Sequence, residues 1–133
     1  MELTTRIPAL SLAVVGAQYP NRDGSDRRFE ILLCTPGEPV ELVPEPRNRH
    51  DENAVAVRSA RGVQIGYLTA ERCGRIGSIL RSGREVQAVF QAPVSWGAWI
   101  RVAFDGEVPQ VAPIEPAGDP EPDFYPDEVW PDD

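Results

Sequence analysis

Polar side chains that could bind a ligand gather in one short stretch, residues 45–57, with the sequence EPRNRHDENAVAV. His50 places an aromatic ring beside the carboxylate of Asp51, so the ring could stack on a base while the carboxylate accepts a hydrogen bond from a hydroxyl group. Asn48, Asp51 and Asn53 could equally hold the loop in shape, because Asn and Asp side chains cap turns. A ligand site and a self-bonded loop are therefore both open interpretations.

The rest of the sequence offers no catalytic or metal-binding pattern. His50 is the single histidine, and neither a Cys-x-x-Cys nor a His-x-x-x-His spacing occurs, so a set of metal ligands is not expected. Gly-x-Ser-x-Gly and glycine-rich phosphate loops are absent, and neither Cys34 nor Cys73 has a histidine close in sequence. The sequence predicts a protein that is not an enzyme and needs no cofactor, with a hydrolase or nuclease as the least favoured class.

Cys34 and Cys73 lie in unrelated contexts, an apolar run and a helix-like segment, which favours two buried small side chains over a disulfide. The apolar run at 7–17 is preceded by Glu2 and interrupted by Pro8, which is not typical of a signal peptide. No run approaches the roughly 20 apolar residues of a membrane span. We expect a cytoplasmic protein with no membrane association.

The net charge of -8 is unevenly distributed. Eight of the 21 acidic residues lie at 115–133, a stretch without a basic residue, so residues 1–114 hold 13 acids against 13 bases. Every base is arginine, whose planar guanidinium suits phosphates and stacked bases, although a G+C-rich genome would produce the same bias through its codons. Without its acidic end, the body of the chain is neutral.

Alternating apolar and polar residues, separated by turn residues, predict about seven short strands. One helix is expected over 70–81, with Thr69 as its N-cap and Gly83 just past its end. A polar loop is expected over 21–28. The expected strands are 11–19, 29–34, 39–44, 54–58, 63–68, 85–94 and 98–104.

Short antiparallel strands with one helix between them suit a mostly β fold, a small, partly open barrel of the oligonucleotide-binding (OB) kind with one main α-helix. A β-sandwich is the competing architecture. We expect the barrel domain over 11–108, after a lead-in at 1–10 and before an acidic, proline-rich tail at 109–133 that is extended or disordered. Aromatic residues among the acids of this tail are typical of a peptide that docks on a surface: Phe124, Tyr125 and Trp130.

Three segments in chain order resemble the HIRAN domain, over about residues 11–105. They are VVGAQY at 14–19, the polar stretch at 45–57 and IGYL at 65–68, which leads into the expected helix. The middle segment is the specific one, since the family pattern there is close to EP-x-N-P-x-D-x-N-A-V-x-V, followed by GY-L. The resemblance implies a modified OB barrel that binds single-stranded DNA, with a preference for a free 3′ end.

HIRAN domains occur in Swi/Snf-type helicases and as small free-standing bacterial proteins. The resemblance therefore implies a role in DNA repair or replication-fork processing, with a helicase or another repair protein as a partner.

The resemblance also implies roles for individual residues. Asp51 would receive the terminal 3′ hydroxyl, the ring of His50 would stack on the end nucleotide, and Tyr19 would line the same pocket. Asn48 and Asn53 match positions that shape the loop, Asn53 as a structural residue. The other implied nucleic-acid contacts are Gln18 after the first strand, Arg72 in the helix, and Trp96 and Trp99 in the last hairpin, where ordinary rim tryptophans are the alternative.

Four positions depart from the family pattern. Arg49 stands where proline is usual, His50 where tyrosine is common, Gln18 where an arginine often follows the first strand, and Thr69 where a basic residue begins the helix, with Arg72 three residues later. Each lost cation removes a contribution from counterion release, so stacking, at ~1–3 kcal/mol per base, would account for more of the affinity. Weak binding at physiological salt is expected.

A protein-interaction module is the alternative function. Its groove would bind a peptide, with the acidic, aromatic tail of the same or a neighbouring molecule among the candidates, so self-association through the tail would distinguish it. In the nucleic-acid interpretation, the tail could instead lie over the groove as a mimic of DNA.

Overall fold

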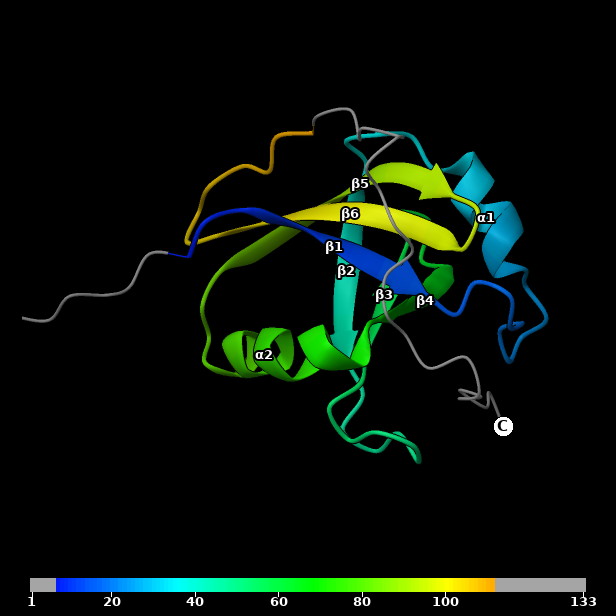
Figure 1. Ribbon diagram of the computed structural model, residues 1–133, viewed down its shortest axis with the longest axis horizontal. Helices are drawn as coiled ribbons and strands as arrows, with labels where there is room; N and C mark the ends of the chain where they lie inside the picture. The colour runs from blue at the N-terminus through cyan, green and yellow to red at the C-terminus, as the bar shows by residue number, and fades with distance from the viewer. Residues whose placement is uncertain (1–6, 112–133) are drawn as a thin grey trace, which may run out of the picture.

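A computed structural model describes residues 7–111, in which six antiparallel strands close into a barrel with two helices packed against it (Figure 1). The order of strands around the barrel is β1-β4-β3-β2-β5-β6. This order confirms the expected small OB-like barrel, in place of a β-sandwich, but the barrel is closed and not partly open as expected. The elements are β1 (Leu10–Val15), α1 (Arg27–Leu33), β2 (Pro39–Pro44), β3 (Val55–Arg58), β4 (Gln64–Leu68), α2 (Ala70–Arg81), β5 (Val86–Val94) and β6 (Gly97–Phe104).

Alternate residues along the strands point into the barrel and form its core. On β6, Ile100, Val102 and Phe104 are buried, while Trp99 and Arg101 between them are half-buried. Burial of each large apolar side chain stabilises the fold by roughly 1.5–3 kcal/mol. The alternation in the sequence therefore sets which face of each strand lies inside. The facing strands add Leu12, Val14, Val55, Val57, Ile65 and Phe90 to this core.

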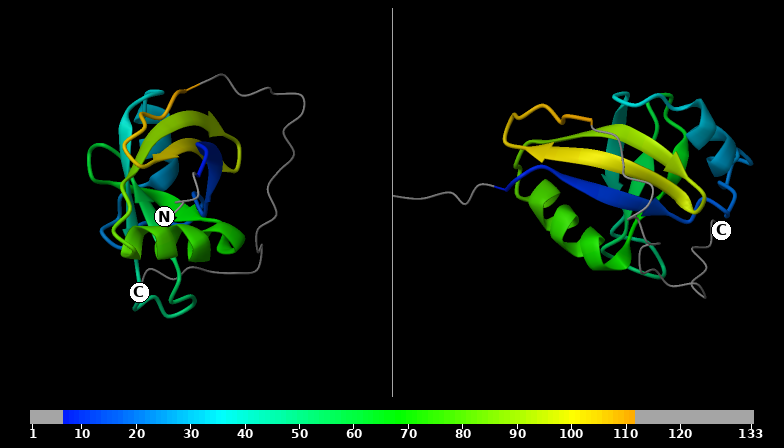
Figure 2. Two further views of the ribbon diagram at one scale, coloured as in Figure 1. Left: turned by 90° about the vertical axis from the view of Figure 1, so that its left-hand side faces the viewer. Right: turned by 45° about the horizontal axis from the view of Figure 1, so that its top comes forward.

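Helix α2 connects β4 to β5 and lies along one side of the barrel, as the sequence predicts (Figure 2). Its Cys73 and Ile76 are buried in the barrel core, while Arg72 and Arg75 are exposed. Thr69 takes the N-cap position, although its side chain makes no capping hydrogen bond. The helix is therefore held by its apolar face, and its arginines face solvent.

The predicted strand at 29–34 is wrong, because this segment belongs to helix α1. The Asp26 carboxylate accepts a hydrogen bond from the Phe29 N–H at 2.9 Å and caps the first turn. Arg27 and Glu30 are buried, whereas the apolar side chain of Phe29 is 61% exposed. A short apolar run does not distinguish a strand from a helix, and here the polar side chains face inward.

The number and limits of the elements change as a result. Seven expected strands and one helix become six strands and two helices over residues 7–111. The polar loop expected over 21–28 ends at Asp26, since Arg27 begins α1.

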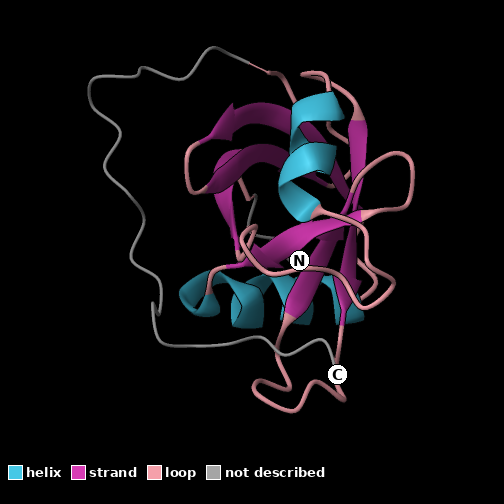
Figure 3. Cartoon of the chain, turned by 90° about the vertical axis from the view of Figure 1, so that its right-hand side faces the viewer, coloured by secondary structure: helices cyan, strands magenta, loops and turns pink. Residues whose placement is uncertain are grey.

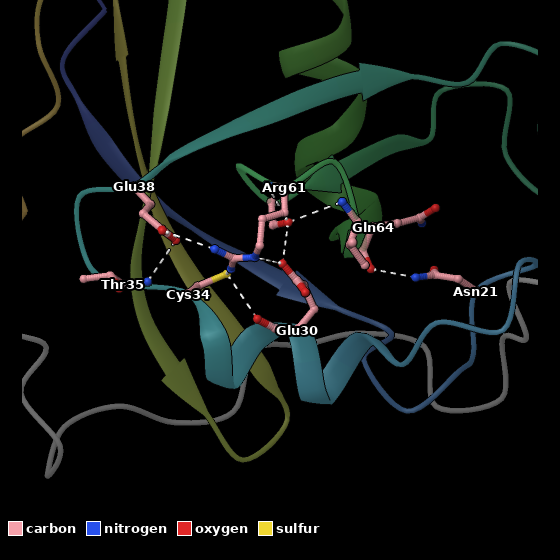
Figure 4. Close-up of polar contacts among 9 residues, drawn as sticks. Asn21, Glu30, Cys34, Thr35, Glu38, Arg61 and Gln64 are labelled. Carbon is pink, nitrogen blue, oxygen red and sulfur yellow. Dashed lines mark hydrogen bonds and ion pairs between the residues drawn. The ribbon is translucent and has the colours of Figure 1, made fainter.

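A buried carboxylate attaches α1 to the β3–β4 hairpin (Figure 4). Glu30 Oε2 accepts hydrogen bonds from the Ser59 hydroxyl at 2.7 Å and from Nε of Arg61 at 2.6 Å. The same guanidinium reaches Glu38 Oε2 at 3.3 Å. Because a buried charge is strongly unfavourable unless it is paired, these contacts fix α1 against the hairpin.

Cys34 and Cys73 are free thiols, as their unrelated sequence contexts predict. Cys73 is buried, whereas Cys34, at the C-terminal end of α1, is only half-buried. The expected lead-in at 1–10 and tail at 109–133 lie largely outside the described residues. Within residues 7–111, no helix is long and apolar enough to span a membrane.

Strand β1 is held by close approach of its neighbours on both edges. It pairs with β6 from Leu10 to Val14, but with β4 only at Val14 and Val15. A Cβ atom at Gly66 would overlap the Val15 carbonyl oxygen. Closure of the barrel between β1 and β4 therefore depends on the absence of a side chain at this position.

We expect Gly66→Ala to lower the free energy of unfolding by about 1–3 kcal/mol, as overpacking commonly does. Urea denaturation followed by circular dichroism measures the change. Gly74→Ala is the matched control, because a Cβ atom there meets nothing within 4 Å, and alanine in a helix is favoured over glycine by up to about 1 kcal/mol. Unchanged stability of the Gly66→Ala variant would contradict the steric role of Gly66.

Candidate nucleic-acid interface

The loop at 45–54 joins β2 to β3 and projects beyond α2 (Figure 3). Main-chain hydrogen bonds close its base, with Glu45 N–H donating to the Ala54 carbonyl at 2.8 Å. The Ala54 N–H donates to the Asp51 carbonyl at 2.9 Å, and the Asn48 N–H to the Glu45 carbonyl at 3.0 Å. The loop is therefore a folded unit.

The side chain of Asn48 fixes the path of the main chain at the tip of this loop. Its Oδ1 accepts hydrogen bonds from the N–H groups of His50 at 2.9 Å and Asp51 at 3.1 Å. Its Nδ2 donates to Glu45 Oε1 at 3.1 Å. One side chain thus orients the main chain of both predicted contact residues.

Asp51 is half-buried and has partners on both carboxylate oxygens. Oδ1 accepts a hydrogen bond from the Asn53 N–H at 2.8 Å, and Oδ2 accepts one from the Cys73 thiol at 3.5 Å. Each carboxylate oxygen has two lone pairs, so Asp51 can shape the loop and still accept a further donor. The neighbouring His50 ring is exposed.

The thiol of Cys73 connects the loop to α2 and acts as a hydrogen-bond donor. Burial raises the pKa of Cys73 from 9.0 to about 11, and the negative charge of Asp51 adds to this effect. The thiol therefore stays protonated at neutral pH, and its single proton is within reach of two acceptors, Asp51 Oδ2 at 3.5 Å and the Ala70 carbonyl at 3.3 Å.

A buried arginine organises the turn that follows β1. Arg27 is 1% exposed. Its NH1 donates to the Gly16 carbonyl at 3.0 Å, and its Nε donates to Asn21 Oδ1 at 2.6 Å. The guanidinium also lies over the ring of Tyr67, 5.6 Å from the ring centroid, a distance at which a cation–π attraction operates. Arg27 therefore ties the segment at 16–21 to β4.

Tyr67 extends these contacts to the polar loop. Its hydroxyl donates to Glu45 Oε1 at 2.9 Å, the same oxygen that Asn48 Nδ2 contacts. Burial is the main cause that raises the pKa of Tyr67 above its usual value, so the hydroxyl remains a donor at neutral pH. A continuous set of contacts thus runs from the turn after β1, through Arg27 and Tyr67, to Glu45 and the loop.

The two tryptophans lie at the β5–β6 hairpin, near the same end of β1. Val14 pairs with Ala98 of β6 and with Leu68 of β4, so the hairpin and the start of α2 flank the end of β1. The rings of Trp96 and Trp99 are in edge-to-face contact, with centroids 5.4 Å apart and planes at 82°. Both are half-buried, so each ring keeps some exposed surface.

The remaining predicted residues, Gln18, Tyr19 and Arg72, lie outside the loop at 45–54. Gln18 is exposed and Tyr19 is half-buried in the turn after β1. Arg72 lies on α2, but its side chain lines a cavity between that helix and β1. Direct hydrogen bonds join the Asn48 side chain to the main chain of Asp51, and the Asp51 side chain to the main chain of Asn53. Within residues 7–111, no group of three or more His, Cys, Asp or Glu side chains could hold a metal ion.

Sequence reasoning assigned no role to the residues that hold these segments together. Glu45 and Tyr67 lie inside two of the three segments that carry the HIRAN resemblance, and this position is the one sequence feature that points to them. Arg27 lies beside Arg28 in a polar segment, and nothing in the sequence marks it as buried. Cys73 has no sequence feature that points toward Asp51.

We expect the free energy of unfolding to fall as the pH rises from about 9 to about 11. The pKa of Cys73 is about 11 in the folded protein against 9.0 otherwise, so the stabilisation is complete below pH 9 and is lost toward pH 11. A difference of two pKa units sets an upper limit of about 3 kcal/mol. Urea denaturation at a series of pH values measures the change.

Cys73→Ser is the informative variant, because serine keeps a donor for Asp51 but does not titrate in this range. Its stability should fall less between pH 9 and pH 11 than that of the unmodified protein. Cys34→Ser should reduce the alkaline loss in the same way, because burial also raises the pKa of Cys34 to about 11. An equal alkaline loss in the Cys73→Ser variant and the unmodified protein would show that this thiol does not contribute.

Known proteins resemble this chain in sequence pattern and in fold. A crystal structure of the HIRAN domain of human HLTF superposes with a TM-score of 0.59 at 22% identity, covering 73% of this chain and 74% of that chain. A crystal structure of a protein from Lactobacillus plantarum superposes with a TM-score of 0.62 at 19% identity, covering 71% of this chain and 91% of that chain. At these identities the two structures show a shared fold.

Comparison with curated protein sequences gave no match. The HIRAN domain family, in contrast, matches residues 7–94. This range includes the barrel from β1 to β5, the turn after β1, the loop at 45–54 and α2. The chain therefore belongs to the HIRAN domain family.

Proposed function

We propose that this protein is a non-catalytic module that binds single-stranded DNA and recognises a free 3′ end. Membership of the HIRAN family supports nucleic-acid binding. Four aromatic side chains support the proposal physically: an exposed His50 ring next to Asp51 in the loop, a half-buried Tyr19 after β1, and half-buried Trp96 and Trp99 at the β5–β6 hairpin. Aromatic rings provide stacking surfaces for unpaired bases.

The main support for the proposal is the hydrogen bonding of the Asp51 carboxylate. Its carboxylate is held in place by the Asn53 N–H and the Cys73 thiol, and it retains lone pairs for another donor. In this proposal, a terminal 3′ hydroxyl donates a hydrogen bond to this carboxylate. A terminal phosphate would instead bring negative charge against negative charge, which is unfavourable.

The charge distribution predicts modest affinity. Residues 1–114 are neutral, and several of the arginines among them have partners, as Arg27, Arg61 and Arg84 show. Counterion release is therefore small, and stacking provides most of the binding free energy. We propose that the protein acts in DNA repair or replication-fork processing beside a helicase or another repair protein, which would supply the DNA ends.

Asp51→Asn should reduce the preference for a free 3′ end without removing the loop contact. The amide keeps an oxygen for the Asn53 N–H but has no charge to repel a phosphate. Fluorescence anisotropy at low salt, with oligonucleotides bearing a 3′ hydroxyl or a 3′ phosphate, measures the ratio of the two affinities. A charged hydrogen bond of about 1.5–3 kcal/mol corresponds to a ratio of roughly 10 to 100 in the unmodified protein.

Glu52→Gln is the matched control, because it makes the same charge change at an exposed neighbour and should leave the ratio unchanged. The proposal fails if neither oligonucleotide binds, or if the Asp51→Asn variant keeps the full preference. Absent binding together with self-association in light scattering would favour the protein-interaction module instead.

Tyr19→Ala should weaken the binding of both oligonucleotides to the same extent, by roughly 1–3 kcal/mol, because a stacking surface does not distinguish a hydroxyl from a phosphate. The same anisotropy titrations measure this loss. A Tyr19→Phe variant should bind like the unmodified protein, since the ring remains. A loss confined to one of the two oligonucleotides would contradict the assigned role.

A further inference from the structure

A cavity of about 220 Å³ lies between α2 and the first half of β1, away from the loop at 45–54. The topology explains its position, because β4 pairs with β1 only at Val14 and Val15. Before these residues, β1 has a strand partner on the β6 side alone, and α2 lies on its other side (Figure 2). The cavity is lined by Ile7, Pro8, Leu10, Leu12, Arg72, Arg75, Ile76 and Phe104.

The lining combines an apolar surface with two cations. Six of the eight lining residues are apolar, and the other two are Arg72 and Arg75, both exposed on α2. Among the described residues, neither arginine forms an ion pair or a side-chain hydrogen bond. Such a site favours a ligand that inserts an apolar ring and places negative charge beside it. A nucleic-acid backbone supplies the charge but no ring for the apolar surface.

We propose that this cavity binds the acidic, aromatic segment at the C-terminal end of the same chain. Phe124 and Tyr125 stand between acids, in the sequence DPEPDFYPDE at 119–128. The whole region at 115–133 has eight acids and no base. The segment at 119–128 therefore combines a ring and flanking negative charge, the two properties that suit the cavity, within a few residues.

Size and reach both permit this contact. An apolar cavity of ~150 Å³ holds a benzene molecule, so about 220 Å³ accommodates the phenyl ring of Phe124. Phe124 lies 13 positions after Val111, the last described residue, and a chain of that length spans up to ~45 Å. A domain of this size has a radius of gyration of about 13 Å, so the cavity is within reach from Val111.

Covalent attachment favours this segment over a free peptide. A tether of this length gives an effective concentration on the order of millimolar, which is enough to populate a weak contact. The exposed apolar face of α1, formed by Phe29, Leu32 and Leu33, is a less suitable site. The acids Asp23 and Asp26 near it are balanced by Arg22 and Arg28, so this face has no excess of positive charge to select an acidic ligand.

Docking of this segment would also affect nucleic-acid binding, a consequence that rests on the proposed function. Arg72 is among the residues assigned to nucleic acid, and the docked acids would occupy it. Removal of residues 112–133 should then strengthen oligonucleotide binding. The docking itself is measured without nucleic acid, so the two proposals can fail separately.

Fluorine NMR of the full chain labelled with fluorophenylalanine tests the docking directly. The four phenylalanines report on four places: Phe29 on α1, Phe90 in the core, Phe104 in the cavity wall, and Phe124 in the proposed ligand. In the unmodified protein, the Phe124 signal should differ from that of a free peptide of residues 119–133. Phe124→Ser should move the Phe104 signal and leave the Phe29 and Phe90 signals in place.

Charge reversal at the two cavity arginines is the second test of the docking. The double substitution Arg72→Glu and Arg75→Glu should return the Phe124 signal to its free-peptide position, while an unchanged Phe90 signal reports an intact core. Arg58→Glu, at an exposed arginine of β3 outside the cavity, is the matched control and should leave Phe124 unmoved.

Four results would overturn the proposal. The first is a Phe124 signal at the free-peptide position in the unmodified protein, and the second is a response to Phe124→Ser at Phe29 in place of Phe104. The third is a Phe124 signal that is unchanged by the charge reversal. The fourth is a Phe124 signal that moves to the free-peptide position on dilution. The last result would assign the contact to a neighbouring molecule.

Discussion

The buried guanidinium of Arg27 connects the turn after β1 to β4 through Gly16, Asn21 and Tyr67. Arg27 is 1% exposed, and such a charge is tolerated only where other groups replace its water. The Gly16 carbonyl, the Asn21 side chain and the ring of Tyr67 provide that replacement. Satisfying Arg27 therefore orders the turn after β1 and places Tyr67, whose hydroxyl in turn contacts Glu45.

The same network of contacts also orders the loop at 45–54. Asn48 contacts the same oxygen of Glu45 as Tyr67 does and holds the main chain of His50 and Asp51. A loop that is already hydrogen-bonded loses less conformational entropy when it binds a ligand. The two interpretations of the polar stretch, a self-bonded loop and a ligand site, are thus compatible, because the bonds that build the loop leave lone pairs on Asp51.

Predictions from the sequence were correct for elements in which the spacing of apolar residues marks the buried face. The strands of the barrel alternate apolar and polar residues, and α2 has an apolar face, so both were predictable. Helix α1 was not, because its Arg27 and Glu30 are buried while Phe29 and Leu32 are exposed. The buried face of α1 therefore combines Ile31 with two charged side chains, and partners such as Arg61, far along the chain, meet these buried charges.

The sequence alone predicts the approximate positions of the six barrel strands, helix α2, the family resemblance and the chemistry available in the polar loop. The folded arrangement adds which charges lie inside, that Cys73 faces Asp51, and that Arg72 lines a separate cavity with Arg75. The reason is physical. Periodicity records which face of one element is apolar, whereas the burial of a polar group depends on partners from other elements, and these meet only when the barrel closes.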